Sequence, residues 1–254
     1  MLICQKNIQI AYDVASMSAN LDFINLMSYD FHGSSWEKTL ADHHSPLYKR
    51  PGETTNLNSD YAVNYWISKG MPASKINMGV PLYGQSWTLT SNAIVPPAPA
   101  SGGAPAGLFT GTSGILAYYE ICNYVRTAGW QVVQDPTHAI GPYAVSPTSP
   151  KYWVGYDDPA MATIKSNYAL SKGLGGIMLW DISTDDFHNT CGAGVNPVTT
   201  AIFNTLKGTS PSTTTTTTSP LTTTTSAATT TTTTKATTTT KSSGPCKLHL
   251  YNMI

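Results

Sequence analysis

The sequence is poor in charged residues and in long apolar runs. Only 11% of its 254 residues are charged, and 14 basic side chains balance 14 acidic ones at pH 7. Because nucleic acids and anionic membranes attract basic patches, this balance excludes both as expected partners and favours a neutral ligand. No run reaches the roughly 18 apolar residues of a membrane span, and the first residues lack the charged-then-apolar pattern of a secretion signal.

Cysteine is scarce, and its spacing excludes the common metal motifs. The four cysteines are Cys4, Cys122, Cys191 and Cys246, with no C-x-x-C pair and no histidine at metal-binding spacing. We therefore expect no metal and no cofactor. Cys122 and Cys191 both lie in the part expected to fold, and in a secreted protein they are candidates for a disulfide. The pairing of Cys4 and Cys246 stays open.

The C-terminal part lacks the apolar residues needed for a core. Between residues 209 and 241, 21 of 33 positions are threonine, and most others are serine, proline or alanine. Such a stretch cannot bury enough apolar surface to fold, so we expect the folded part to end near Lys207 and a disordered linker to occupy 208–244. Tracts of this composition resemble O-glycosylated stalks, which indicates an extracellular protein and leaves a mucin-like surface protein as an alternative.

Three short apolar runs, each followed at some distance by a helical pattern, indicate strands that alternate with helices. The runs cover 22–29, 76–83 and 176–181, and the helical patterns begin at Ser59, Asp158 and Asn196, residue types that are favoured as helix N-caps. Such alternation is typical of parallel β/α units. Three units cannot close a barrel, so they are either the last three of an eight-unit (β/α) barrel or half of an open doubly wound sheet. No glycine-rich phosphate loop follows a strand, which disfavours a nucleotide-binding sheet.

The pattern breaks between the second and third units. Residues 84–156 contain a stretch rich in proline, glycine and alanine, a helical pattern in "GILAYYEICNYVRTAG", and strand-like pieces at "WQVVQ" and "KYWVGYDD". This segment predicts a small α+β insertion at the place where the loops of a barrel build its active site. A bridge from Cys122 to Cys191 would attach the insertion to the segment that follows the last strand.

A large aromatic side chain ends each of the three predicted strands. Because strand side chains alternate, Tyr29, Tyr83 and Trp180 are expected on one inward face, and Met27 shares the face of Tyr29. At the mouth of a barrel they would form an aromatic pocket that suits the apolar face of a sugar ring. The alternatives are that the aromatics only cover the hydrophobic core and that Asp30, which follows Tyr29, only caps a turn.

Five phrases carry a family resemblance: "LDFINLMSYDFHGSSWE", "INMGVPLYGQSW", "LAYYEIC", "YWVGYDD" and "GGIMLWDISTDDF". In order and spacing they resemble the C-terminal half of the catalytic domain of family 18 glycoside hydrolases, the chitinases of arthropod and vertebrate type, over about residues 8–207. The resemblance implies an α/β fold, the C-terminal portion of a (β/α)8 TIM barrel, with 1–207 as a partial catalytic domain around the insertion 84–156. The threonine tract and Cys246 resemble the linker and the start of a chitin-binding module, which would be truncated here at 245–254.

The resemblance implies hydrolysis of β-1,4-linked N-acetylglucosamine polymers with retention, assisted by the acetamido group of the substrate. Tyr29 and Asp30 would be catalytic, because Tyr29 would hold the acetamido group and Asp30 would bind the sugar at the cleavage subsite. The other implied substrate-binding residues are Met27, Trp36, Tyr83, Gln85 and Trp180. We expect a secreted monomer that binds chitin or chitooligosaccharides.

The sequence departs from the family pattern at several positions. Gln85 replaces the usual arginine, which removes a fixed positive charge near the sugar. Gly111 and Thr112 stand where relatives often carry an Arg-Glu pair, and one extra serine precedes Trp36. We expect these changes to affect affinity or specificity and not by themselves to prevent catalysis.

The largest departure is the absence of the family's acid motif, D-x-x-D-x-D-x-E. The chain has three glutamates, Glu37, Glu53 and Glu120, and none follows aspartates at that spacing. We interpret the absence as truncation: the full-length parent is expected to be a chitinase, and this chain alone is expected to lack hydrolytic activity. The alternative is a non-catalytic chitin-binding lectin of the same fold. A glutamate at the last position of the motif in the parent would indicate the enzyme.

Overall fold

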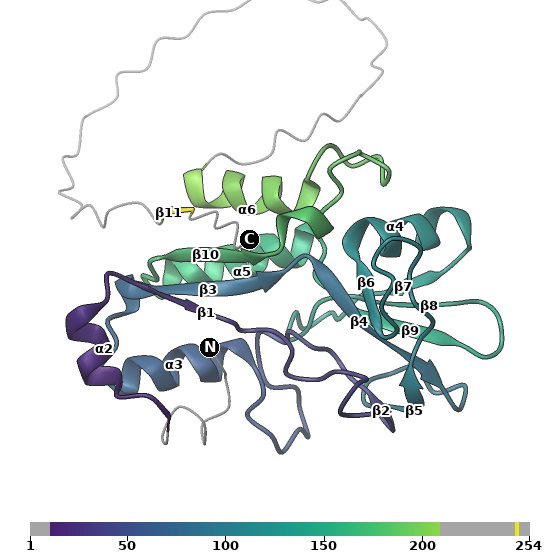
Figure 1. The fold of residues 1–254 in the computed structure, drawn as a ribbon, viewed down its shortest axis with the longest axis horizontal. Coiled ribbons are helices and arrows are strands. Elements are labelled where there is room, and N and C mark those ends of the chain that lie inside the picture. The colour runs from purple at the N-terminus through teal and green to yellow at the C-terminus, as the bar shows by residue number, and fades with distance from the viewer. Residues whose placement is uncertain (1–10, 209–246, 249–254) are drawn as a thin grey trace, which may run out of the picture.

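The computed structural model describes residues 11–208 and 247–248. The predicted linker apart from Gly208, the cysteines Cys4 and Cys246, and most of 245–254 lie outside the described residues. Within the described part, a parallel sheet flanked by helices stands beside an antiparallel sheet (Figure 1).

The parallel sheet has the strand order β1-β3-β10-β11. Its strands are β1 (Ile24–Leu26), β3 (Ile76–Pro81), β10 (Gly176–Trp180) and β11 (Lys247–Leu248). Every residue of β3 is buried, which is typical of a central parallel strand that is covered on both faces. Together with the surrounding helices, this sheet gives the mixed α/β fold that the sequence predicts.

Helices cover the parallel strands, with α3 on one side in Figure 1 and the packed pair α5 and α6 on the other. The helices are α2 (Val14–Asn20), α3 (Ser59–Ser68), α5 (Pro159–Ser171) and α6 (Pro197–Lys207), together with the short 3-10 helices η1 (Ala73–Lys75) and η2 (Ile182–Thr184). The Asp158 carboxylate caps α5, at the predicted position. Asn58 rather than Ser59 caps α3, because the Ser59 hydroxyl donates to the Pro46 carbonyl at 3.1 Å instead.

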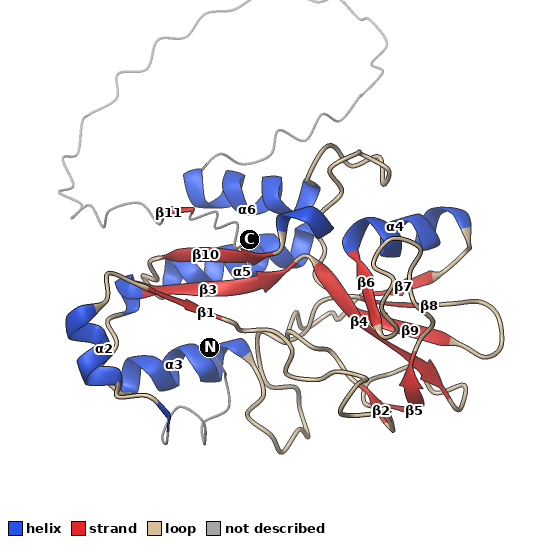
Figure 2. Cartoon of the chain, in the orientation of Figure 1, coloured by secondary structure: helices blue, strands red, loops and turns tan. Residues whose placement is uncertain are grey.

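The second sheet is antiparallel and has the order β2-β5-β4-β9-β8-β7, with β6 paired to β4. Its strands are β2 (Leu40–Ala41), β4 (Tyr83–Leu89), β5 (Ala98–Gly103), β6 (Ile115–Ala117), β7 (Gln131–Val133), β8 (Tyr143–Val145) and β9 (Tyr152–Gly155), and α4 (Tyr118–Thr127) follows β6. Figure 2 shows these strands gathered at one end of the parallel sheet. The buried rings of Trp87 and Trp153, 5.7 Å apart, lie in its core. Because β2 precedes residue 84, this sheet extends beyond the segment in which the insertion was expected.

Two predicted strands end earlier than the apolar pattern indicates. The Ser28 N–H bonds back to the Leu26 carbonyl at 2.8 Å, which turns the chain out of the ladder, so β1 stops before Tyr29. β3 ends at Pro81, and Tyr83 begins β4 of the other sheet, where it lies opposite Ala117. The prediction of an aromatic residue at the end of each strand is therefore wrong for Tyr29 and Tyr83. It holds for Trp180, the last residue of β10.

A disulfide joins Cys122 of α4 to Cys191, which follows η2. It connects the helix beside the antiparallel sheet to the segment after β10, as expected. In the part of the chain that the structure describes, no helix has the length and apolar character required to cross a membrane.

Candidate functional site

Tyr29 and Asp30 lie where the chain leaves β1. The Tyr29 ring packs over Gly79 of β3, where a Cβ would come within 2.8 Å of the ring carbon Cε1 and 2.6 Å of the Leu26 carbonyl oxygen. Only glycine therefore fits at position 79 beneath the ring. Asp30 has a φ of 55°, a left-handed conformation that aspartate tolerates better than most residues. This conformation is part of the turn that leads from β1 into the site.

Three hydrogen-bond partners converge on Oδ1 of Asp30. The Tyr83 hydroxyl donates at 2.7 Å, Gln85 Nε2 donates at 2.9 Å, and Nδ1 of His44 lies 3.4 Å away. Burial alone would raise the pKa of Asp30, but these hydrogen bonds and the charge of His44 outweigh it and hold the pKa below its ordinary value. The side chain is still 41% exposed. Asp30 is thus an ionised, fixed carboxylate that remains accessible to a ligand.

His44 is a member of this site that the sequence patterns did not reveal. Its buried ring lies 5.0 Å from the ring of Tyr83, and its Nε2 donates to the Tyr83 carbonyl at 3.2 Å. Its own carbonyl accepts the Phe31 N–H at 2.9 Å. His44 therefore holds both the side chain of Asp30 and the backbone that follows it.

An apolar cluster lies next to the carboxylate. The Tyr29 and Tyr83 rings meet edge to face with centroids 6.2 Å apart, and the Tyr29 hydroxyl lies 3.9 Å from the Met178 sulfur. Met27 packs against the same cluster. Burial, with a smaller effect from the Asp30 charge, raises the pKa of both tyrosines, so their hydroxyls stay protonated and can donate.

Trp180 and Trp36 stand at different places relative to this cluster. Trp180 follows Met178 by two residues on β10, so both side chains point to the same face, and Trp180 is 37% exposed. Trp36 is 54% exposed and packs against Gly33. It borders a separate groove of about 1210 Å³ between the 32–55 segment and loops of the antiparallel sheet. None of the residues that contact Asp30 lines this groove, so the groove is separate from the Asp30 site.

The three glutamates are engaged away from Asp30. Glu37 accepts from Nδ1 of His32 at 2.7 Å, and Glu53 pairs with Arg50. Glu120 is buried and accepts backbone N–H groups on both of its oxygens at the start of α4. Gly111 and Thr112, the substituted pair, lie in the exposed loop before β6. None of these three carboxylates is placed to act as an acid beside Tyr29.

The structure therefore brings together most of the residues that the sequence singled out, at the carboxyl end of parallel strands. Met27, Tyr29, Asp30, Tyr83 and Gln85 form one group, Trp180 shares a strand face with its member Met178, and Trp36 lies apart. The fixed carboxylate and the aromatic rings lie at the edge where α/β domains usually carry their ligand sites.

The chain belongs to glycosyl hydrolases family 18, because the model of that family matches residues 2–185. The probable chitinase 10 of Drosophila melanogaster is 46% identical over 207 residues, which are 80% of this chain and 9% of that protein. Catalytic domain 2 of the Ostrinia furnacalis Group II chitinase superposes with a TM-score of 0.77 at 41% identity, over 81% of this chain and 53% of the solved one.

Human YKL-39, described as a pseudo-chitinase with retained chitooligosaccharide binding properties, superposes with a TM-score of 0.74 at 41% identity, over 79% of this chain and 54% of the solved one. The chain thus spans about half the length of the solved structures it matches. A chitinase domain and a protein described as a pseudo-chitinase thus match this chain at equal identity.

Proposed function

We propose that the Asp30 site binds an N-acetylglucosamine unit of chitin or of a chitooligosaccharide. The observation that carries this proposal is the convergence of Tyr83, Gln85 and His44 on one oxygen of Asp30 beside an apolar cluster. A sugar ring presents hydroxyl groups at its edge and C–H groups on its faces, and this site offers an acceptor for the first and aromatic surface for the second. The exposed indole of Trp180 would support the sugar from below.

The roles of the two polar residues follow from their protonation states. The Tyr29 hydroxyl, kept protonated by burial, would donate to the acetamido oxygen and orient it toward the anomeric carbon. That oxygen attacks the carbon, the glycosidic C–O bond breaks, and the leaving oxygen takes a proton from an acid. The ionised Asp30 would stabilise the positive charge that develops on the oxazolinium ring, and water then restores the product with retention.

This reaction needs an acid that the chain does not supply. The sequence has no D-x-x-D-x-D-x-E string, and its three glutamates have other partners. We therefore propose that the parent protein hydrolyses chitin and that this chain alone binds without cleaving. In the parent, the parallel strands would form the C-terminal portion of a (β/α)8 barrel. The disulfide supports a secreted protein, and a monomer suffices because every proposed contact comes from one chain.

A non-catalytic lectin is the second candidate, favoured by the resemblance to the pseudo-chitinase YKL-39. The two candidates share the Asp30 site and differ at the acid. A glutamate at the last position of the motif in the parent transcript supports the enzyme, and any other residue supports the lectin.

Calorimetric titration of the chain with chitotetraose tests the binding proposal. Replacement of Trp180 or Asp30 by alanine is expected to lower the affinity at least tenfold, because the first removes an exposed aromatic surface and the second removes a carboxylate acceptor held by three partners. Phe203, which is 39% exposed on α6, is the matched control, and Phe203→Ala should leave the affinity unchanged. Equal affinity for all four proteins would overturn the proposal. Release of a fluorophore from a chitobioside reporter by the purified chain would show that the chain cleaves after all.

A further inference from the structure

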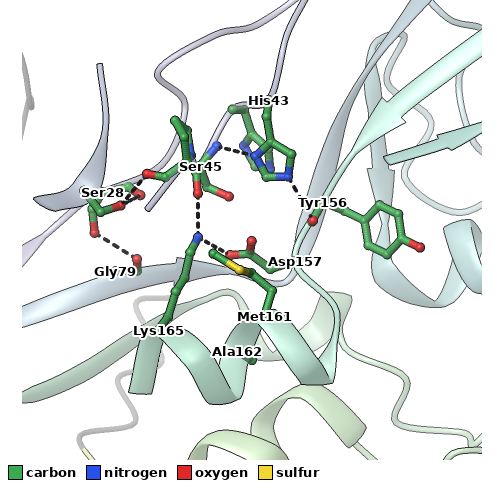
Figure 3. A network of polar contacts seen from close by, with 12 residues as sticks. Ser28, His43, Ser45, Gly79, Tyr156, Asp157, Met161, Ala162 and Lys165 are labelled. Atoms are coloured by element: carbon green, nitrogen blue, oxygen red, sulfur yellow. Dashed lines mark hydrogen bonds and ion pairs between the residues drawn. The ribbon is translucent and has the colours of Figure 1, made fainter. Parts of the chain in front are cut away.

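A buried ion pair contacts the backbone next to His44. Lys165 of α5 and Asp157 are both completely buried, and Nζ of Lys165 donates to Oδ2 of Asp157 at 2.5 Å (Figure 3). Oδ1 of Asp157 has no hydrogen-bond partner among the described residues. The free energy needed to remove two charges from water is often larger than the free energy that their attraction provides. A buried ion pair is therefore weak evidence of a gain in stability. A role in fixing a conformation is the better-attested use.

The pair holds one backbone position. The Nζ of Lys165 also donates to the carbonyl of Ser45 at 2.6 Å, and Figure 3 shows Lys165 between Ser45 and Asp157. Ser45 belongs to the segment 42–46, which follows β2 and carries His44. Lys165 therefore holds Ser45, which is the residue next to His44, the histidine that contacts Asp30.

His43 fixes the same segment from the other side. Its Nδ1 accepts the Ser45 N–H at 3.2 Å and its Nε2 lies 3.1 Å from the Tyr156 carbonyl, which can only accept. The ring is therefore neutral, with its proton on Nε2. Burial, assisted by the charges of His44, Lys165 and Arg50, lowers the pKa of His43 well below its ordinary value, which agrees with this geometry.

The segment reaches the site through His44. The His44 carbonyl accepts the N–H of Phe31, and its ring contacts the Asp30 carboxylate and the Tyr83 carbonyl. A chain of direct contacts thus runs from Lys165 to Ser45, along the backbone to His44, and on to Asp30. The phrase "YWVGYDD", whose first aspartate is Asp157, contributes no side chain to the ligand-facing cluster and supplies the far end of this chain.

We propose that Lys165 and Asp157 are positioning residues, which fix the Ser45 carbonyl and, through His44, the orientation of the Asp30 carboxylate. The consequence for sugar binding rests on the proposed function, but the positioning itself is a property of the free chain. It can therefore be measured without a ligand.

The test variant is Lys165→Met with Asp157→Leu. Replacing both partners leaves no unpaired buried charge, and the apolar side chains of methionine and leucine fill the space of the ion pair. This variant is therefore expected to fold. Lys172→Met is the matched control, because Lys172 lies just after the same helix and pairs with Asp60 in a partly exposed ion pair. Asp157→Asn is the conservative variant, since its amide oxygen still accepts from Lys165. If the double variant shows no cooperative unfolding, Lys165→Met with Asp157→Asn, which also leaves no buried charge and no donor from position 165 to the Ser45 carbonyl, replaces it with the same expected outcomes.

The first readout is the carboxyl ¹³C titration of Asp30 by NMR in the free chain. In the double variant we expect its titration midpoint to rise by about half a pH unit or more, because His44 no longer stabilises the charged form. The Lys172→Met and Asp157→Asn proteins should titrate as the unaltered chain does. An unchanged midpoint in the double variant would overturn the proposal.

The second readout separates positioning from a general loss of structure. The affinity for chitotetraose should fall about tenfold when the double variant is made in the unaltered chain. When the double variant is made in the Asp30→Ala chain, it should cause no additional fall in affinity. An equal loss in both backgrounds would show a merely structural role and would also overturn the proposal. If the unaltered chain does not bind chitotetraose, the proposed function fails, while the titration still decides the role of Lys165 and Asp157.

Discussion

The buried, neutral His43 should make the chain lose stability in mild acid, before most carboxylates are protonated. Its pKa is well below the ordinary 6.5 in the folded chain and returns to about that value on unfolding. As the pH falls below 6.5, the unfolded chain therefore binds one proton more than the folded chain. The free energy of unfolding therefore decreases as the pH falls below 6.5, by about 1.4 kcal/mol for each pH unit. Between pH 7.5 and pH 5 the loss from His43 is about 2 kcal/mol.

Urea denaturation at pH 7.5, 6 and 5, followed by tryptophan fluorescence, measures this loss. A loss of about 2 kcal/mol lowers the urea midpoint by roughly 1 M for a domain of this size. His43→Gln, which keeps a donor toward the Tyr156 carbonyl, should remove most of the pH dependence. His188→Gln controls for the loss of an imidazole, because His188 is exposed on the segment after η2.

Other ionisable groups do not obscure the comparison. Burial raises the pKa of Asp157, which acts in the opposite direction, but Asp157 is retained in the His43→Gln protein. Hydrogen bonds hold the pKa of Asp30 and of Asp135 below the ordinary value despite burial, so their contributions are lost only in stronger acid. An equal fall in midpoint for the unaltered chain and His43→Gln between pH 7.5 and 5 would refute the assignment of a neutral, buried His43.

Three further outcomes follow from the contacts of the site and its supports. Gly79→Ala should lower the free energy of unfolding by about 1–3 kcal/mol, because the new Cβ would collide with the Leu26 carbonyl and the Tyr29 ring. A thermal midpoint equal to that of the unaltered chain would contradict this expectation. Tyr83→Phe should raise the carboxyl pKa of Asp30 in an NMR titration and weaken chitotetraose binding about tenfold, since it removes a donor to a charged acceptor. Replacing both Cys122 and Cys191 by serine should cost about 4 kcal/mol in urea denaturation, given a separation of 69 residues, and an unchanged midpoint would show that the bridge does not constrain the unfolded chain.

Local signals predicted the elements whose ends are set locally. β10 lies within one residue of its apolar run, and α5 begins at the predicted aspartate cap, because cap and apolar pattern are properties of neighbouring residues. The ends of β1 and β3 depend instead on backbone geometry that an apolar run does not record: the chain turns at Ser28, and after Pro81 it passes into the other sheet, so each apolar run continues past the last paired residue. β5 has small side chains and little alternation, and its pairing with β4 and β2 could not be read from its own sequence.

The same distinction applies to the candidate site. Tyr29, Asp30 and Tyr83 were predicted to lie together because each follows an apolar run that ends at one edge of the fold. His44 was not predicted, since its partners Asp30 and Tyr83 are 14 and 39 residues away and two adjacent histidines carry no periodic signal. The role of Lys165 could not be predicted from the sequence for a similar reason, because Ser45, whose carbonyl it contacts, is 120 residues away.

A single residue, Leu82, separates β3 from β4, and it is pinned from two directions. Its N–H donates to the Trp180 carbonyl at 2.8 Å, and its carbonyl accepts the Tyr118 N–H at 3.1 Å. These two hydrogen bonds tie the junction of β3 and β4 to β10 on one side and to α4 on the other, so Tyr83, the next residue, is held in place beside β10. The site between Tyr83 and β10 should therefore be preformed before a ligand binds. Binding should involve little movement of one sheet relative to the other, and it should favour sugar rings whose shape already fits the site.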